Sequence, residues 1–216
     1  MKHRIEIDNI VLNYGQNTIL SDIYLYTQTG TITGVLGRNG SGKSSLLKII
    51  FGSLNTELSS IRWNGRNIKK NRRFSNIRYL PQHNFIPQKL TLQRVFNDFN
   101  INGDEFIQIF PAFKDRNKDF IYQLSGGEKR IIEVYLIIKS KALFCLLDEP
   151  FTNLMPIYID KIKTIIQQES QTKGFILTDH LYKNVLDISD VIFTLKQGKT
   201  QLISSELLKS NPLNLY

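Results

Sequence analysis

The chain has 216 residues, 41% hydrophobic and 22% charged, which is enough for one well-buried core at ordinary globular composition. Its longest strictly apolar run, residues 142–147, is far shorter than the roughly 20 residues that span a bilayer, and the N-terminus has no apolar signal core. We therefore expect a cytosolic chain whose membrane role comes through a partner. Its one cysteine, Cys145, excludes an internal disulfide and a multi-cysteine zinc site, and its apolar neighbours predict a buried thiol.

Part of the formal net charge of +9 is concentrated in one segment after residue 60. Its basic residues are Arg62, Arg66, Lys69, Lys70, Arg72 and Arg73. Such a cluster can be a solvated loop, or it can face anionic lipid head groups, an acidic partner or nucleic acid. We favour the solvated loop over the membrane side, and the membrane side over nucleic acid. The charge alone does not decide the function.

Strands dominate the first third of the chain. Alternating or β-branched apolar residues predict strands at residues 5–12, 19–27, 31–36, 61–64 and 77–80. Leu46, Leu47 and Ile50 have helical spacing instead, and they predict a helix at residues 44–51 that Gly52 ends. One helix is therefore expected among several strands.

The middle of the chain, from Thr91 to Phe110, has apolar residues at helical spacing and no strand signal. We expect a small helical subdomain there, at about residues 84–140. Beyond residue 127 the predicted helices are 128–139, 157–168, 181–186 and a short one from near Ser205, and the predicted strands are 143–147, 174–178, 191–195 and one after Gly198. This alternation predicts an α/β fold with a mainly parallel sheet, in a single domain over residues 1–216.

The segment Gly37–Ser44 fits the phosphate-binding pattern G-x-x-x-x-G-K-[ST], and the predicted strand before it and helix after it supply the required context. Glycines let backbone N–H groups turn toward one point, and the helix adds its positive N-terminal end. Lys43 would reach the β- and γ-phosphates, and the Ser44 hydroxyl would ligate Mg²⁺. The nucleotide-binding residues expected here are Gly37, Arg38, Asn39, Gly40, Ser41, Gly42, Lys43, Ser44 and Ser45. The alternative is a glycine turn that only caps a helix.

Asp148 and Glu149 follow the buried strand 143–147. Carboxylates at the carboxyl end of a parallel strand lie at the ligand-binding edge of an α/β sheet. We expect Asp148 to hold Mg²⁺ directly or through water, and Glu149 to act as the general base toward an attacking water. A solvated helix cap before Pro150 is the alternative, and the phosphate loop argues against it.

The segment Leu124–Glu128, taken alone, is a Ser-Gly-Gly turn that leads into a helix. In this order with the phosphate loop and Asp148-Glu149, it resembles the ATP-binding cassette (ABC) family, from about Arg4 to Leu208. The resemblance implies a P-loop NTPase core, an N-terminal antiparallel β subdomain and a small helical subdomain. Leu124–Glu128 resembles the signature motif, whose last residue is usually Gln. In the family it contacts the γ-phosphate of the nucleotide that the other subunit holds, through the positions Ser125, Gly126, Gly127 and Glu128.

The resemblance assigns further roles. Tyr14 matches the aromatic residue that stacks on adenine, and Gln82 matches the glutamine that reaches the metal and the attacking water beside the membrane subunit. His180 matches the histidine that contacts the γ-phosphate. A strand-end tyrosine and a structural histidine are the plain alternatives. Met155 departs from the family, which usually has an aspartate there that crosses the dimer interface, so we expect weaker or altered coupling between the two sites.

The resemblance implies an ATPase subunit that energises a separate membrane permease, as a head-to-tail homodimer or heterodimer with ATP and Mg²⁺. It would lie at the inner face of the cell membrane and transfer a phosphoryl group to water. One alternative is a cassette ATPase acting on nucleic acid or the ribosome. Because this chain has one cassette and neither a long coiled coil nor zinc-binding cysteines, we do not expect nucleic acid as a partner. The other alternative, motivated by Met155, is a weakly hydrolysing regulatory module. The cargo is not readable from this sequence.

Overall fold

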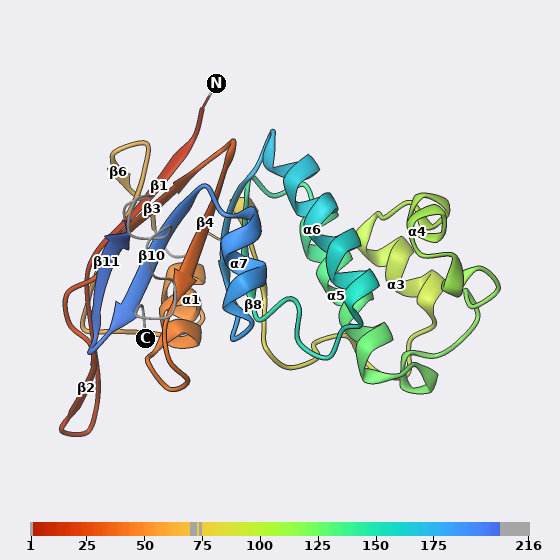
Figure 1. Cartoon of the computed structure of the whole chain (residues 1–216), viewed down its shortest axis with the longest axis horizontal. Helices are drawn as coiled ribbons and strands as arrows, with labels where there is room; N and C mark the ends of the chain where they lie inside the picture. Colours follow the sequence, from red (N-terminus) through yellow and green to blue (C-terminus); the bar gives the residue numbers. More distant parts are fainter. Residues whose placement is uncertain (1, 70–72, 74, 204–216) are drawn as a thin grey trace.

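A computed structural model of the chain describes residues 2–69, 73 and 75–203. Two sheets stand beside a group of helices (Figure 1). The first sheet contains β1 (Arg4–Tyr14), β2 (Asn17–Leu20), β3 (Tyr24–Gln28), β5 (Leu58–Trp63) and β6 (Arg66–Asn67). The second sheet contains β4 (Thr31–Leu36), β7 (Ile77–Leu80), β8 (Phe144–Asp148), β9 (Gly174–Thr178), β10 (Val191–Lys196) and β11 (Lys199–Ile203).

The second sheet is mainly parallel, as expected. Its strand order is β11-β10-β4-β9-β8-β7, and among the strands that the structure describes only β11 pairs antiparallel, at one edge. The side chains of β8 alternate between two cores, because Cys145 and Leu147 face one core whereas Phe144 and Leu146 face the other. The sheet is thus covered on both faces, which explains why its central strands β4, β8 and β9 are buried along their whole length.

The first sheet is antiparallel, and it corrects one prediction. Residues 19–27 form two strands, β2 and β3, that pair with different halves of the long strand β1. The chain bends between them, where the N–H groups of Ser21 and Asp22 both donate to the carbonyl of Gly198, at 2.8 and 3.2 Å. Alternation alone does not show this break, because the acceptor is far away in the sequence.

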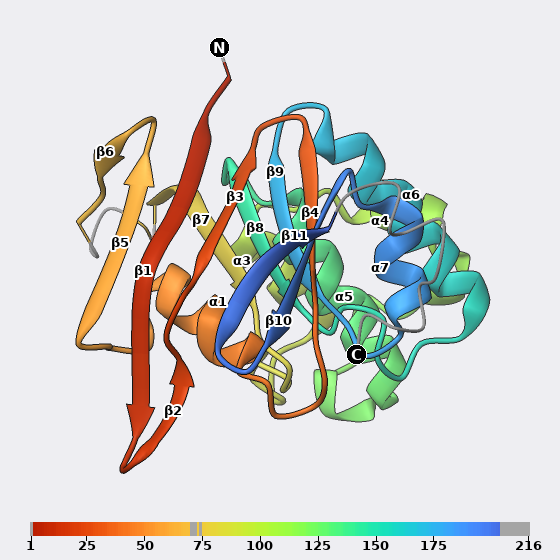
Figure 2. The ribbon, with the colours of Figure 1, turned by 60° about the vertical axis from the view of Figure 1, so that its left-hand side comes forward.

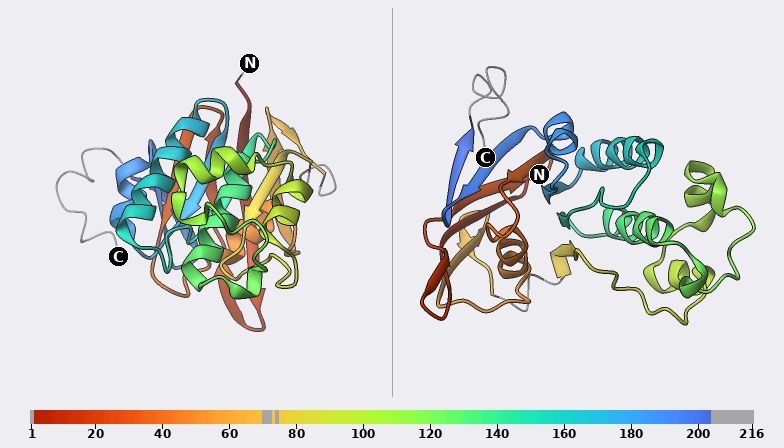
Figure 3. Two further views of the ribbon diagram at one scale, coloured as in Figure 1. Left: turned by 90° about the vertical axis from the view of Figure 1, so that its right-hand side faces the viewer. Right: turned by 60° about the horizontal axis from the view of Figure 1, so that its bottom comes forward.

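The described helices are α1 (Lys43–Phe51), α3 (Leu92–Phe99), α4 (Gly103–Ile109), α5 (Gly126–Lys139), α6 (Pro156–Ser170) and α7 (Tyr182–Ile188), with 3₁₀ turns at Pro111–Phe113 and Ile121–Gln123. Helix α1 packs between the two sheets, and α5 and α6 stand between the second sheet and the outlying helices α3 and α4 (Figures 1 and 3). The predicted helical stretch from Thr91 to Phe110 is α3 and α4, separated at Asn100, which has left-handed backbone angles. The helix expected from Ser205 lies outside the described residues.

An aromatic cluster holds the outlying helices to α5. Phe106 is fully buried, and its ring centroid lies 5.0 Å from those of Phe96, Phe110, Phe113 and Tyr135. Since Tyr135 belongs to α5, the core of the helical region is continuous with the core of the sheet. Movement of α3 and α4 is therefore tied to α5 through direct packing.

Two other features of the sequence have definite places. Arg62 is paired with Glu6 at 3.5 Å and with Asp8 at 3.3 Å, so it adds no free positive charge to the basic segment. Arg73 donates to the carbonyl of Ile49, whereas Lys70 and Arg72 lie outside the described residues. Cys145 is completely buried, and burial raises the pKa of its thiol to about 12, which makes it unreactive.

Candidate functional site

Four neighbouring parallel strands deliver the predicted site residues to one edge of the second sheet (Figure 2). β4 leads into the phosphate loop, β9 leads to His180, β8 ends at Asp148, and β7 stops shortly before Gln82. The register aligns these exits, because Asp148 pairs with Thr178. Residues far apart in the sequence thus meet where the carboxyl ends of the strands emerge.

The phosphate loop is shaped by its glycines and by Lys43. Gly42 precedes α1 with a left-handed backbone, φ 103°, which a residue with a β-carbon rarely adopts. The Lys43 ammonium folds back over the loop and donates to the carbonyls of Gly37 and Arg38, at 2.6 and 3.1 Å. Burial lowers the pKa of Lys43, although Glu149 and Asp148 oppose that shift. A positive charge and the N-terminal end of α1 therefore point at the same place, as an anion site requires.

Asp148 is buried, and its carboxylate is the centre of a polar cluster. Oδ1 accepts hydrogen bonds from Thr178 at 2.9 Å and from Ser44 at 3.1 Å, and Oδ2 accepts one from Tyr79 at 3.0 Å. Burial, together with the charge of Asp148, raises the pKa of Tyr79, so its hydroxyl stays protonated and donates. The cluster fixes the carboxylate beside the first turn of α1.

Glu149 stands at the open side of this cluster. Its backbone is left-handed, with φ 52°, which turns its side chain out of the strand direction. Its Oε2 lies 3.1 Å from the Gln82 amide nitrogen and 3.7 Å from Nδ1 of His180. His180 is half-exposed, and the adjacent Asp179 carboxylate shapes its loop by accepting the N–H groups of Phe151 and Leu181.

These residues line one cleft of about 680 Å³. Its lining is Tyr14, Ile19, Asn39, Gly40, Gly42, Lys43, Ser44, Ser45, Gln82, Glu149 and His180. Tyr14 is 54% exposed, so its ring is available to a flat ligand. Gly37 and Arg38 line an adjoining hollow with His180, and neither hollow includes Ser41.

The cleft offers oxygen atoms rather than a preformed metal cage. Within the described part of the chain, no three His, Cys, Asp or Glu side chains gather as metal ligands. Ser44 Oγ and Asp148 Oδ1 nevertheless lie 3.1 Å apart at the cleft, with Gln82 on its wall. Mg²⁺ keeps several of its waters and takes phosphate oxygens as ligands. A site beside bound phosphates therefore needs only a few protein oxygens.

A buried arginine, which no sequence pattern predicted, supports the site. Arg130 of α5 is 4% exposed and donates to the carbonyls of Pro81, Asp148 and Glu149, at 2.7, 2.5 and 2.9 Å. One turn later, Glu133 accepts the N–H groups of Phe85 and Ile86. Together they hold the Gln82 loop and the end of β8 to one helix, although nothing in the local sequence indicates these distant carbonyls.

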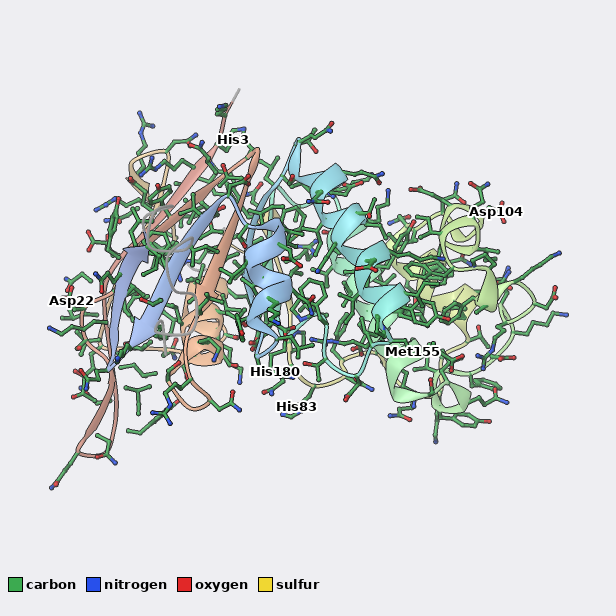
Figure 4. The ribbon with its side chains drawn as sticks, in the orientation of Figure 1. His3, Asp22, His83, Asp104, Met155 and His180 are labelled. Atoms are coloured by element: carbon green, nitrogen blue, oxygen red, sulfur yellow. The ribbon has the colours of Figure 1, made fainter. Side chains whose placement is uncertain are left out.

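The segment 125–128 opens α5, but it lies in a different hollow from the phosphate loop. This second hollow, of about 410 Å³, is lined by Ser125, Gly127, Glu128, Asn153, Leu154, Met155 and Tyr158. A β-carbon on Gly127 would lie 2.8 Å from the Asn153 carbonyl, whereas one on Gly126 would meet nothing within 4 Å. The chain's own packing explains the first glycine but not the second. Met155, labelled in Figure 4, is 59% exposed and immediately precedes α6, and its side chain makes no capping hydrogen bond.

Comparison with known proteins relates the whole arrangement to one family. A family model described as ABC transporter matches residues 20–152. The lipopolysaccharide export system ATP-binding protein LptB of Haemophilus influenzae is 29% identical over 209 residues, which cover 89% of this chain and 86% of that protein. The high-affinity branched-chain amino acid transport ATP-binding protein BraG of Pseudomonas aeruginosa is 26% identical over 209 residues and 90% of each chain.

Solved structures agree on the fold. A structure described as the ATP-binding subunit of an ABC transporter has a TM-score of 0.82 at 19% identity, over 98% of this chain and 97% of that one. A bacterial Atm1-family ABC exporter with ATP bound has a TM-score of 0.83 at 20% identity, over 99% of this chain and 41% of that one. No helix in the described part of this chain is long and apolar enough to cross a bilayer.

Proposed function

The chain belongs to the ABC transporter family, and on that premise we propose how it works: two cassettes bind head to tail and drive a separate membrane permease. It is an ATP-binding subunit whose activity is ATP hydrolysis coupled to transport. We propose that residues 1–216 act as one ATPase domain. Its place is then the inner face of the cell membrane, reached through the permease, whose own surface selects the cargo.

The observation that carries this proposal is the separation of two half-sites within one chain. The cleft at the phosphate loop includes none of residues 125–128, and the hollow at the start of α5 includes none of residues 37–45. Gly126 faces open space, as a surface does that receives another molecule. A second cassette placed head to tail supplies each half-site with the other half, either as a second copy or as a related subunit.

The residues of the cleft divide the work of phosphoryl transfer to water. Tyr14 stacks on the adenine ring, and the loop N–H groups with Lys43 bind the β- and γ-phosphates. Glu149 takes a proton from the attacking water through its carboxylate oxygen. Gln82 orients that water, and His180 donates a hydrogen bond to the γ-phosphate.

Ser44, Asp148 and Gln82 are the residues that would hold Mg²⁺. When bound, the ion supplies charge neutralisation at the β- and γ-phosphate oxygens. The chain's own residues position these ligands. The hydrogen bonds from Thr178 and Tyr79 keep the Asp148 carboxylate directed toward Ser44. Arg130 fixes the carbonyls on either side of the site, so that Gln82 and Glu149 stay at hydrogen-bonding distance.

The variant Glu149→Gln tests this proposal. Glutamine keeps the shape and hydrogen bonds of the side chain but cannot accept the proton, so we expect hydrolysis to fall by at least about 100-fold. ATP binding should remain, and the variant should accumulate as an ATP-bound dimer, measured by light scattering. The exposed Asp98→Asn is the matched control and should behave as the parent. Hydrolysis at the parental rate by Glu149→Gln would remove Glu149 from the role of base.

A further inference from the structure

The carboxylate of Glu128 lies at the N-terminal end of α5, where the proposed dimer brings the γ-phosphate of the partner's ATP. The inference below rests on that proposed function. Glu128 Oε2 accepts the N–H of Ser125 at 2.7 Å, and the Glu128 N–H donates to Ser125 Oγ at 3.3 Å. The side chain is thereby fixed against the helix cap. A fixed negative charge at this point repels a phosphate group, which the neutral glutamine usual in the family does not.

Arg116 contacts the other oxygen of the same carboxylate. Its Nη1 donates to Glu128 Oε1, and its Nε donates to Asp119 Oδ2 at 2.7 Å. The Arg116 and Glu128 side chains are each 28% exposed, so solvent screens the pair only in part. Partial burial opposes ionisation of Glu128, but the hydrogen bonds from Ser125 and the charge of Arg116 prevail and lower its pKa. Glu128 is therefore ionised at neutral pH and needs a nearby cation.

The loop that bears Arg116 is itself tied down. The Leu92 N–H donates to the Asp119 carbonyl at 3.0 Å, and the Gln93 N–H donates to the Asn117 carbonyl at 2.9 Å. These bonds join the loop to the first turn of α3, so the guanidinium is presented from a fixed backbone. Asp119 holds its Nε side and leaves Nη1 directed at Glu128.

We propose that Arg116 is a positioning residue for the nucleotide held by the partner subunit. Its guanidinium offsets the charge of Glu128 and clamps the carboxylate to the cap of α5, so that this helix end still accepts a γ-phosphate. An ordinary exposed ion pair contributes little to stability. A purely structural pair would therefore leave nucleotide-dependent assembly almost unchanged when it is broken.

The test uses the full chain with Glu149→Gln as the reference, and it measures the ATP concentration that gives half-maximal dimerisation. Arg116→Met leaves Glu128 ionised and unpaired beside the phosphate, so that concentration should rise about tenfold. Arg116→Lys keeps the charge and should raise it only about threefold. Adding Glu128→Gln to Arg116→Met should bring the value back to within about threefold of the reference, because no charge is left to offset.

Two controls separate this role from loss of structure. Arg94→Met breaks another arginine–aspartate pair of the helical region and should not change the half-maximal concentration. ATP binding to the monomer, followed with a fluorescent analogue, should be equal in every variant, since the monomer's own cleft does not contain Arg116. If Arg116→Met fails to fold, the half-maximal ATP concentrations of Arg116→Lys and Glu128→Gln are compared with that of the reference instead.

Equal defects in Arg116→Met and in the double variant would overturn the proposal, since the charge of Glu128 would then be irrelevant. No change in Arg116→Met would overturn it as well. If the reference itself forms no ATP-dependent dimer, the head-to-tail assembly fails and the role of Arg116 fails with it.

Discussion

Lys43 is buried at a point where its charge needs an anion. It is 7% exposed, its partners in the free chain are two carbonyls, and burial lowers its pKa. A lysine with a lowered pKa costs the folded chain stability while the lysine is protonated, so the cost is full below the folded pKa and disappears as the pH rises from that value to the unfolded one. Bound phosphates relieve it without any change of pH.

Lys43→Met removes this cost, so it should leave the thermal stability of the free chain unchanged or raise it, and it should abolish the stabilisation of the chain by ATP. In the parent, ATP at 100 times its Kd adds about 2.7 kcal/mol, which corresponds to a rise of roughly 5–10 °C in Tm for a chain of this size. Thermal unfolding with and without ATP and Mg²⁺ measures both quantities. A parental shift in the variant would show that Lys43 does not contact the phosphates.

At the residue scale, the sequence identified the side chains that gather at the cleft but not those that hold them in place. Lys43, Asp148 and Glu149 were predictable because they adjoin a glycine pattern or the end of an apolar strand. Thr178 and Arg130 were not assigned a role, because their partners at Asp148 lie 30 and 18 positions away in the chain. Such contacts depend on sheet register and helix placement, which local patterns do not encode.

At the scale of elements, helix α5 links three parts of the molecule. Its start bears the segment 125–128. Arg130 and Glu133, one turn apart, hold the Gln82 loop, and Tyr135 packs on the aromatic cluster of the helical region. The existence and type of such elements were largely predictable from period. The break between β2 and β3 was not, because a distant carbonyl decides it.

The start of α5 gives a prediction in which stability and activity move in opposite directions. Gly126→Asp places a carboxylate in the first turn at a point with free space, so the helix dipole should stabilise the chain by about 0.3–1 kcal/mol. In the proposed dimer the same charge would repel the partner's γ-phosphate, so hydrolysis should fall by more than about tenfold. Denaturant unfolding and steady-state hydrolysis measure the two effects.

Gly126→Ala is the matched control for that variant, since it adds a β-carbon without a charge. Its loss of hydrolysis should be smaller than that of Gly126→Asp. Full hydrolysis by Gly126→Asp would contradict the placement of a phosphate at this helix end, and a large loss of stability would contradict the open space around Gly126.

At the scale of the whole molecule, the separation of the half-sites decides which damaged chains can complement each other. A Lys43→Met chain retains an intact α5 end, and a Gly126→Asp chain retains an intact phosphate loop. Each should be nearly inactive alone. In an equal mixture about half of the dimers contain one of each, and one of their two sites is whole, so about a quarter of the parental hydrolysis should return. Steady-state hydrolysis of the mixture, compared with each chain alone, measures this recovery.

The mixture of Lys43→Met with Glu149→Gln is the negative control for this experiment. Both side chains line the same cleft of one chain, so no pairing of these two variants assembles an undamaged site, and no activity should return. Recovery of hydrolysis in both mixtures would mean that the activity returns for a reason other than the pairing of half-sites between subunits. Recovery in neither would mean that one chain completes its own site, and the open face at Gly126 would then need a different occupant.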